Sequence, residues 1–253
     1  MIPLTITGIP QFQFQTRDLS KAQRFYQQLL GLSPLAREER SLSLGMASGR
    51  IDLYEAPFDS ALHGENTSAV GSQRFCFRAS GDPAAAMVDL REMGAEVLEG
   101  SLCSGEGALG PMKSFCLFDP DQNLVELAFY ETRNRPLQLL TIDSVSLLSA
   151  DCGRSLAFYE TLGVRSSHAE EGLCVLPVGR QRLLLCQDSR RCPAHAPYAA
   201  AGSATFTLTA AGSSARVRSE LEALGLSFRE DRSAFCLFDA DGNLLRLLPE
   251  GGA

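Results

Sequence analysis

Few residues of this chain have the types and spacing of a familiar catalytic group. Its three histidines, His63, His168 and His195, are best explained as loop or surface residues, and they support no Ser-His-Asp or Cys-His arrangement. The eight cysteines are spread singly without a Cys-x-x-Cys pair, and no phosphate-binding glycine loop precedes a helix. Any site therefore depends on polar residues that the fold brings together.

The composition is that of a globular protein with substantial cores. Hydrophobic residues make up 45% of the chain, charged residues make up 21%, and the net charge is −7, which argues against nucleic acid or an anionic membrane as partner. No segment approaches the roughly 18 apolar residues of a membrane span, and the start lacks the features of a signal peptide. These patterns predict a cytoplasmic protein. Four cysteines lie inside apolar, strand-like runs, which predicts buried free thiols; they are Cys76, Cys116, Cys186 and Cys236.

An internal repeat dominates the organisation of the chain. Residues 115–127 and 235–247 are identical at nine of thirteen positions, at an offset of 120. The segment beginning at Arg24 resembles the one beginning at Ala157, and the offset near Leu90 is 131. The repeat predicts two copies: residues 1–133, a linker at 134–140, and residues 141–253.

Each copy has the pattern of two βαβββ modules. In copy one, residues 9–16 alternate as in a half-buried strand, Asp18 is a helix N-cap, and Gly31 closes the helix. Strands are predicted near 42–47, 50–56, 73–79, 96–99, 114–118 and 123–130, with a second helix at 83–93. The drop in offset places extra sequence between Glu99 and Met112, where the composition indicates either a surface loop or a flexible lid.

These segments together resemble the vicinal oxygen chelate superfamily of glyoxalases, bleomycin-resistance proteins and extradiol dioxygenases. The resemblance is carried, in order, by Arg17-Asp-Leu, Phe25-Tyr, Leu30-Gly-Leu and the run from Phe118 to Glu126, and it extends over both copies. Copy one is most similar to glyoxalase-domain proteins of the lactoylglutathione-lyase type. The resemblance implies an α+β fold in which paired modules form cup-shaped mixed sheets.

The resemblance also implies four metal-ligand positions in a cup, which hold Fe, Mn, Ni or Zn with open positions for a substrate. In copy one they fall on Gln11, Asp52, Arg74 and Glu126. In copy two they fall on Ser144, Leu184, Thr205 and Arg246. Copy two thus has no ligand set, and in copy one a guanidinium, which has no lone pair to donate, occupies one position. We expect Arg74 to pair with Glu126 or Asp52.

Two functions follow from these positions. The first is a bleomycin-resistance-like protein that binds a small anionic or carbonyl-bearing molecule in the cup of copy one, with Arg74, Gln11, Gln13 and Tyr54 as binding residues and a degraded metal site. The alternative is a divalent-metal-dependent lyase, isomerase or dioxygenase with Gln11, Asp52 and Glu126 as ligands. In that case Glu126, Tyr54 or His63 is the candidate for acid-base catalysis.

The repeat leaves the pairing of the modules open. One chain can mimic the dimer of single-copy relatives, or two chains can form a homodimer. If cups form between copies, Gln11 and Asp52 meet Thr205 and Arg246, while Ser144 and Leu184 meet Arg74 and Glu126. Neither combination completes a metal site.

Overall fold

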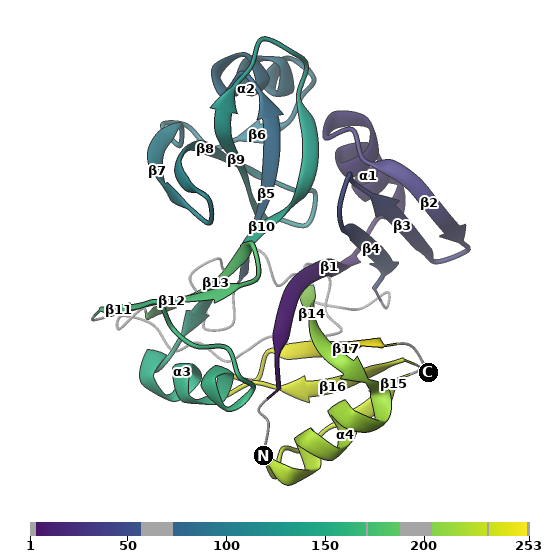
Figure 1. Cartoon of the computed structure of the whole chain (residues 1–253). Coiled ribbons are helices and arrows are strands. Elements are labelled where there is room, and N and C mark those ends of the chain that lie inside the picture. Colours follow the sequence, from purple (N-terminus) through teal and green to yellow (C-terminus); the bar gives the residue numbers. More distant parts are fainter. Residues whose placement is uncertain (1–3, 57–72, 171, 188–203, 232, 252–253) are drawn as a thin grey trace.

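The computed structural model describes residues 4–56, 73–170, 172–187, 204–231 and 233–251. It has the predicted α+β architecture of four consecutive modules, in each of which a long strand leads into a helix and then into further strands (Figure 1). The first two modules consist of β1 (Ile6–Thr16), α1 (Leu19–Gln23), η1 (Arg24–Leu29), β2 (Ser33–Glu38), β3 (Ser41–Gly45) and β4 (Arg50–Glu55), then β5 (Gln73–Gly81), α2 (Pro83–Glu92), β6 (Glu96–Val97), β7 (Cys103–Gly107), β8 (Gly110–Phe118) and β9 (Leu124–Thr132). The last two consist of β10 (Gln138–Ser149), α3 (Cys152–Thr161), β11 (His168–Glu170), β12 (Leu173–Val178) and β13 (Gln181–Gln187), then β14 (Ala204–Ser213), α4 (Ser214–Ala223), β15 (Arg229–Asp231), β16 (Ala234–Phe238) and β17 (Leu244–Gly251).

Each of the two mixed sheets combines one module from each sequence copy. Sheet A has the strand order β15-β16-β17-β14-β1-β4-β3-β2 and joins the first module to the fourth. Sheet B has the order β11-β12-β13-β10-β5-β9-β8-β6 and joins the second module to the third. In both sheets the two modules meet through an antiparallel central pair, β1 with β14 and β10 with β5. The repeat boundary in the sequence is therefore not a boundary between sheets.

The short connection between the copies accounts for the pairing in sheet B. Only residues 133–137 separate β9 from β10, and five extended residues span at most about 18 Å. β10 is thus confined to the sheet that β9 has joined, and the terminal modules pair with each other. The side chain of Gln181 links the two sheets, because its amide hydrogen-bonds both the N–H and the carbonyl of Ile9.

The helix boundaries follow the signals in the sequence. Asp18 accepts hydrogen bonds from the N–H groups of Ser20 and Lys21, both at 3.0 Å, and so caps the first helix as predicted. Gly31 and Gly94 end the helices of the first two modules with φ of 73° and 89°. β2 was not predicted, because all six of its residues are exposed and its sequence has no apolar alternation.

The extra sequence of copy one is a β-hairpin and not a loop or lid. β7 pairs with the first half of β8, with Cys103 opposite Ser114 and Gly107 opposite Gly110. Residues 108 and 109 form the turn, and Gly110, which follows them, has a positive φ of 108° that glycine adopts without strain. The hairpin extends one edge of the molecule (Figure 1).

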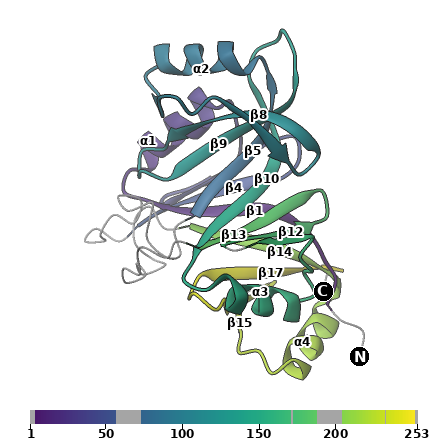
Figure 2. The same cartoon turned by 90° about the vertical axis from the view of Figure 1, so that its left-hand side faces the viewer.

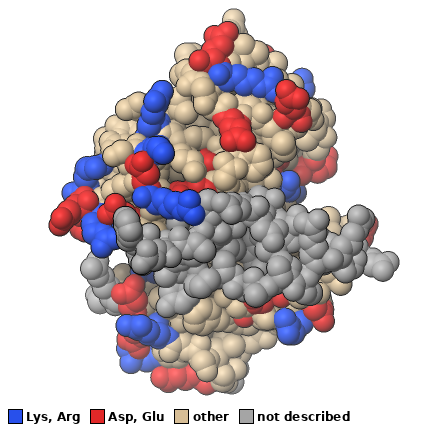
Figure 3. All heavy atoms as spheres, turned by 180° about the vertical axis from the view of Figure 1, so that it is seen from behind, with Lys and Arg blue, Asp and Glu red and all other residues tan. Residues whose placement is uncertain are grey.

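The two modules of copy one pack together through aromatic rings on the faces opposite the cups. The ring centroid of Phe75 lies 4.7 Å from those of both Phe12 and Phe14, in edge-to-face geometry. Figure 2 shows the sheets stacked between the helices of the outer layers. On the face in Figure 3, acidic and basic side chains are interspersed. No helix of the described ranges has the length and apolar character needed to cross a bilayer.

Candidate functional site in the cup of sheet A

The register of sheet A brings four of the predicted positions onto one face. Phe12 of β1 pairs with Phe206 of β14, so Gln11 and Thr205, one residue before each, share the opposite face. On the neighbouring strands, Phe12 pairs with Ile51 of β4 and Phe206 pairs with Leu245 of β17. The next residues, Asp52 and Arg246, therefore point to the same face as Gln11 and Thr205. We call this face the sheet A cup. It contains residues of both copies, as expected if cups form between the copies.

Three polar atoms in the sheet A cup are buried without a hydrogen-bond partner in the described part of the chain. They are Oδ1 of Asp52, Oγ1 of Thr207 and Nε of Arg246. The other oxygen of Asp52 accepts a short hydrogen bond from the side-chain amide of Gln11 and lies 3.5 Å from the guanidinium of Arg50. Arg246 has a 3.4 Å contact between its terminal nitrogen and Asp231. A buried polar atom without a partner costs about 1–3 kcal/mol, so this cluster is poised to gain from a ligand.

A cavity of about 570 Å³ opens next to this cluster. Its polar walls come from both copies and include Gln13, Arg50, Asp52, Tyr54, Asp231 and Arg246. The predicted binding residues Gln13 and Tyr54 therefore line the same cavity as Asp52, and Tyr54 is partly exposed. The volume lies within the range of small-molecule pockets.

Arg74 and Glu126 lie on the corresponding face of sheet B, which we call the sheet B cup. Nε of Arg74 lies 3.5 Å from a carboxylate oxygen of Glu126, one of the two partners that the sequence predicts. Burial lowers the pKa of Arg74, but Glu126 and the surrounding thiols raise it more, so the net pKa lies above its usual value. Burial raises the pKa of Cys116 to about 11 and that of Cys76 well above its usual range. These two thiols are protonated at neutral pH. The described cysteines are free, as predicted, but of the four predicted to be buried, Cys186 and Cys236 are only partly buried.

The donor sets of the two cups do not fit a divalent metal. The sheet A cup offers one carboxylate and one amide, but Thr205 is a poor ligand and Arg246 has no lone pair. The sheet B cup combines Glu126 with Ser144, Leu184 and Arg74. Within the described residues, no three His, Cys, Asp or Glu side chains come close enough to hold an ion. Gln11 and Asp52 lie in a different cup from Glu126, so the three predicted ligands do not form one site.

Of the three histidines, only His168 lies within the described residues. His168 is exposed on β11 and pairs with Glu170 at 3.0 Å, consistent with a surface histidine. His63 and His195 lie outside the described residues. Sequence reasoning missed Thr207, although the alternation Thr205-Phe-Thr207 places it on the same face as Thr205. It also missed Arg50, which precedes Asp52 by two residues and thus shares its face.

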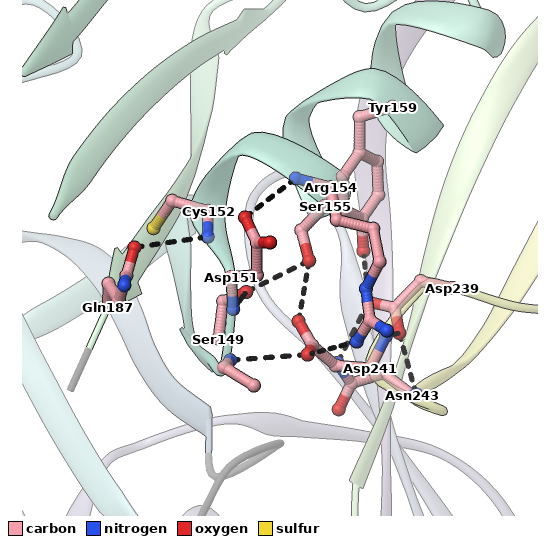
Figure 4. Close-up of polar contacts among 11 residues, drawn as sticks. Ser149, Asp151, Cys152, Arg154, Ser155, Tyr159, Gln187, Asp239, Asp241 and Asn243 are labelled. Carbon is pink, nitrogen blue, oxygen red and sulfur yellow. Dashed lines mark hydrogen bonds and ion pairs between the residues drawn. The ribbon is translucent and has the colours of Figure 1, made fainter. Parts of the chain in front are cut away.

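The repeated Asp-x-Asp-x-Asn turns belong to the framework. In copy two, Asp239 accepts hydrogen bonds from Tyr159 Oη and Asn243 Nδ2, both at 2.8 Å, and Asp241 accepts one from Ser155 at 2.6 Å (Figure 4). In copy one, Asp119 receives the same hydrogen bonds from Tyr26 and Asn123. Each turn thereby ties the helix of one module to the next module of the same copy.

Stability is expected to fall as the pH rises from about 4 to about 6.5, in part because of Asp119. Burial raises the pKa of this carboxyl from 3.8 to about 6, although hydrogen bonds from Asn123 and Tyr26 oppose the shift. Between these values the folded chain holds a proton that the unfolded chain releases, so ionisation costs up to about 3 kcal/mol as the pH rises. Urea unfolding across this range should show a shallower pH dependence for Asp119→Asn than for the unmodified chain. Parallel pH profiles would contradict the assignment.

The comparisons with known proteins agree with this architecture. The family model for the "Glyoxalase/Bleomycin resistance protein/Dioxygenase superfamily" matches residues 8–127. A glyoxalase domain-containing protein of Mycosarcoma maydis is 30% identical over 131 residues, which cover 51% of this chain and 71% of that protein. A virulence protein of Salmonella typhimurium is 26% identical over 129 residues, covering 51% of this chain and 88% of its own length.

Similarity over the whole chain comes from a solved structure. Glyoxalase I from Zea mays superposes with a TM-score of 0.67 at 16% identity, covering 97% of this chain and 93% of that one. At this identity the likeness concerns the fold alone. From the matched segment, the 30% identical relative and the two mixed sheets, we conclude that this chain belongs to the glyoxalase, bleomycin-resistance protein and dioxygenase superfamily.

Proposed function

We propose that the chain binds a small polar molecule in the sheet A cup without a metal ion. The observation that carries this proposal is the set of three buried polar atoms, on Asp52, Thr207 and Arg246, that have no hydrogen-bond partner among the described residues. Two of these residues, Asp52 and Arg246, line a cavity of about 570 Å³, and Thr207 lies on the same face of the sheet. Superfamily membership supports the choice of the cup as the binding surface.

The chemistry of the three atoms defines the ligand that suits them. Nε of Arg246 can only donate, so it needs a carboxylate or carbonyl oxygen. Oδ1 of Asp52 accepts, so it needs a hydroxyl or ammonium group, and Thr207 can serve either group. A ligand with a carboxylate or carbonyl next to a hydroxyl or amine, such as a small 2-hydroxy acid, satisfies both demands. In this proposal the guanidinium of Arg246 binds the carboxylate or carbonyl group of the ligand.

The test compares one arginine from each cup. Glycolate, lactate, glycerate, pyruvate and serine are first screened by their effect on the melting temperature of the purified chain, and the best is measured by calorimetry. Arg246→Gln is expected to weaken binding about 10- to 100-fold, because it removes a charge-assisted hydrogen bond of about 1.5–3 kcal/mol. Arg74→Gln, the matched variant in the sheet B cup, is expected to leave the affinity unchanged.

Two outcomes contradict the proposal. Equal affinity of Arg246→Gln and the unmodified chain would exclude the sheet A cup as the site. Loss of binding in Arg74→Gln alone would move the ligand to the sheet B cup, which contains one of the four binding residues that the sequence predicts.

A further inference from the structure

A groove on the helix side of copy one, outside both cups, has a volume of about 320 Å³. It lies between the first helix, the end of α2 and the turn after β8, and Figures 1 and 2 both show α1 close to the module that contains α2. Cationic and apolar side chains line it, among them Lys21, Arg24, Phe25, Leu29, Met93 and Phe118.

An inserted residue shapes one wall of this groove. The segment Phe25–Gly31 of copy one has one residue more than the corresponding segment of copy two, Phe158–Gly163. The structure absorbs the insertion as η1, a π-helical turn in which the N–H of Leu30 bonds the carbonyl of Phe25 at 3.0 Å. The helix of copy two is α-helical and has no such turn. Single π-turns within helices are frequent at functional sites.

A strained residue lies on the opposite wall. Gln122 has a φ of 65°, whereas copy two has Gly242, with a φ of 83°, at this position. A side chain in the left-handed region costs of order 1 kcal/mol, which glycine avoids. Gln122 directs its amide toward Glu96, at 3.4 Å, on the rim of the groove. Two departures of copy one from copy two therefore meet at one groove.

The charges differ between the copies in the same place. The counterpart of Arg24 is Ala157, and the counterpart of Lys21 is Arg154, which contacts Asp241 at 3.4 Å (Figure 4). In copy one, the side chain of Lys21 is 74% exposed, and its ammonium makes a long ion pair of 3.8 Å with Asp18. Copy one thus presents two cations beside an apolar floor.

We propose that this groove binds a small amphiphilic anion, a carboxylate that carries an apolar chain or ring. The carboxylate lies against Arg24 and Lys21, and the apolar part covers Met93, which is 45% exposed, and the partly buried Leu29. The groove volume is at the lower end of small-molecule sites, so it suits one short ligand and not a helix of a partner. Glu96 at the far rim orients the anion toward the cationic end.

Methyl NMR of the full chain tests this proposal. The sequence has five methionines, so the ¹³C-labelled methyl of Met93 can be assigned with Met93→Leu. Titration with sodium octanoate should move the Met93 signal saturably and leave Met112, on the β7–β8 hairpin, unchanged. Arg24→Ala, which installs the residue of copy two, should raise the dissociation constant about fivefold. Arg91→Ala on α2, an arginine that does not line the groove, is the matched control and should bind as before.

Three results would overturn the proposal. A Met93 signal that does not respond at millimolar octanoate rules out the site. Uniform shifts of all methionine signals mean that octanoate adsorbs nonspecifically to the protein. Equal dissociation constants for Arg24→Ala and the unmodified protein show that the cation plays no part in binding.

Discussion

Replacing Arg78 with methionine is expected to lower the free energy of unfolding by about 3–5 kcal/mol. The substitution would leave the carboxylate of Asp143, which is 0% exposed, without its cation. Arg78 donates two hydrogen bonds to Asp143, at 2.9 and 3.1 Å, and the hydroxyl of Tyr130 donates a third hydrogen bond to it at 2.9 Å. Asp143 lies at a register irregularity of β10, opposite β5, so this pair joins copy one to copy two in the centre of sheet B.

A matched variant on the same strand separates burial from charge. Arg74 lies on the same face of β5, but its side chain is 40% exposed against 12% for Arg78, and it lies 3.5 Å from Glu126, so Arg74→Met should cost less than Arg78→Met. Replacing both partners, as Arg78→Met with Asp143→Leu, should recover most of the lost stability, because no unpaired charge is then buried. Urea unfolding of the variants measures the differences. Equal losses for Arg78→Met and Arg74→Met would refute the argument.

Local signals in the sequence were sufficient for most of the fold. Alternation identified β1 and β5, and Asp18 and Gly31 marked the ends of the first helix, because such signals depend on a few neighbouring residues. The extra sequence that copy one has relative to copy two was located, but the hairpin that it forms was not predicted. Cys103–Gly107 carries small and polar residues and is mostly exposed, so no hydrophobic pattern marks it as a strand.

The sites were harder to predict than the strands. Gln11 and Asp52 were assigned to the same site as Glu126 because all three belong to one sequence copy. Which central strands pair is a long-range property that alternation does not encode, since β1 presents the same face to β14 as it would to β5. The distance between β9 and β10 constrains it, and that constraint becomes apparent only when the strand ends are known.

The largest gain in binding is expected from restoring a ligand set in the sheet A cup. The double variant Thr205→His, Arg246→Glu adds an imidazole and a carboxylate to Gln11 and Asp52, which share that face. Removal of the guanidinium also removes the positive charge that repels a dication. Four such ligands match the N and O donors that Fe, Mn, Ni and Zn accept.

We expect the double variant to bind Ni²⁺ or Zn²⁺ at one ion per chain, about 1,000-fold more tightly than the unmodified chain, a gain of about 4 kcal/mol. Elemental analysis and the shift of the melting temperature with added metal would measure the gain.

Arg74→His in the sheet B cup is the control. Its neighbours at the corresponding positions are Ser144, Leu184 and Glu126, and the raised pKa values of the thiols of Cys76 and Cys116 disfavour the thiolate form that binds metal, so it should gain less. Similar metal uptake by both variants would mean that ligand number in the cup does not decide binding. Stoichiometric metal in the unmodified chain would mean that Arg246 does not prevent it, and the proposed metal-free site would then have to be abandoned.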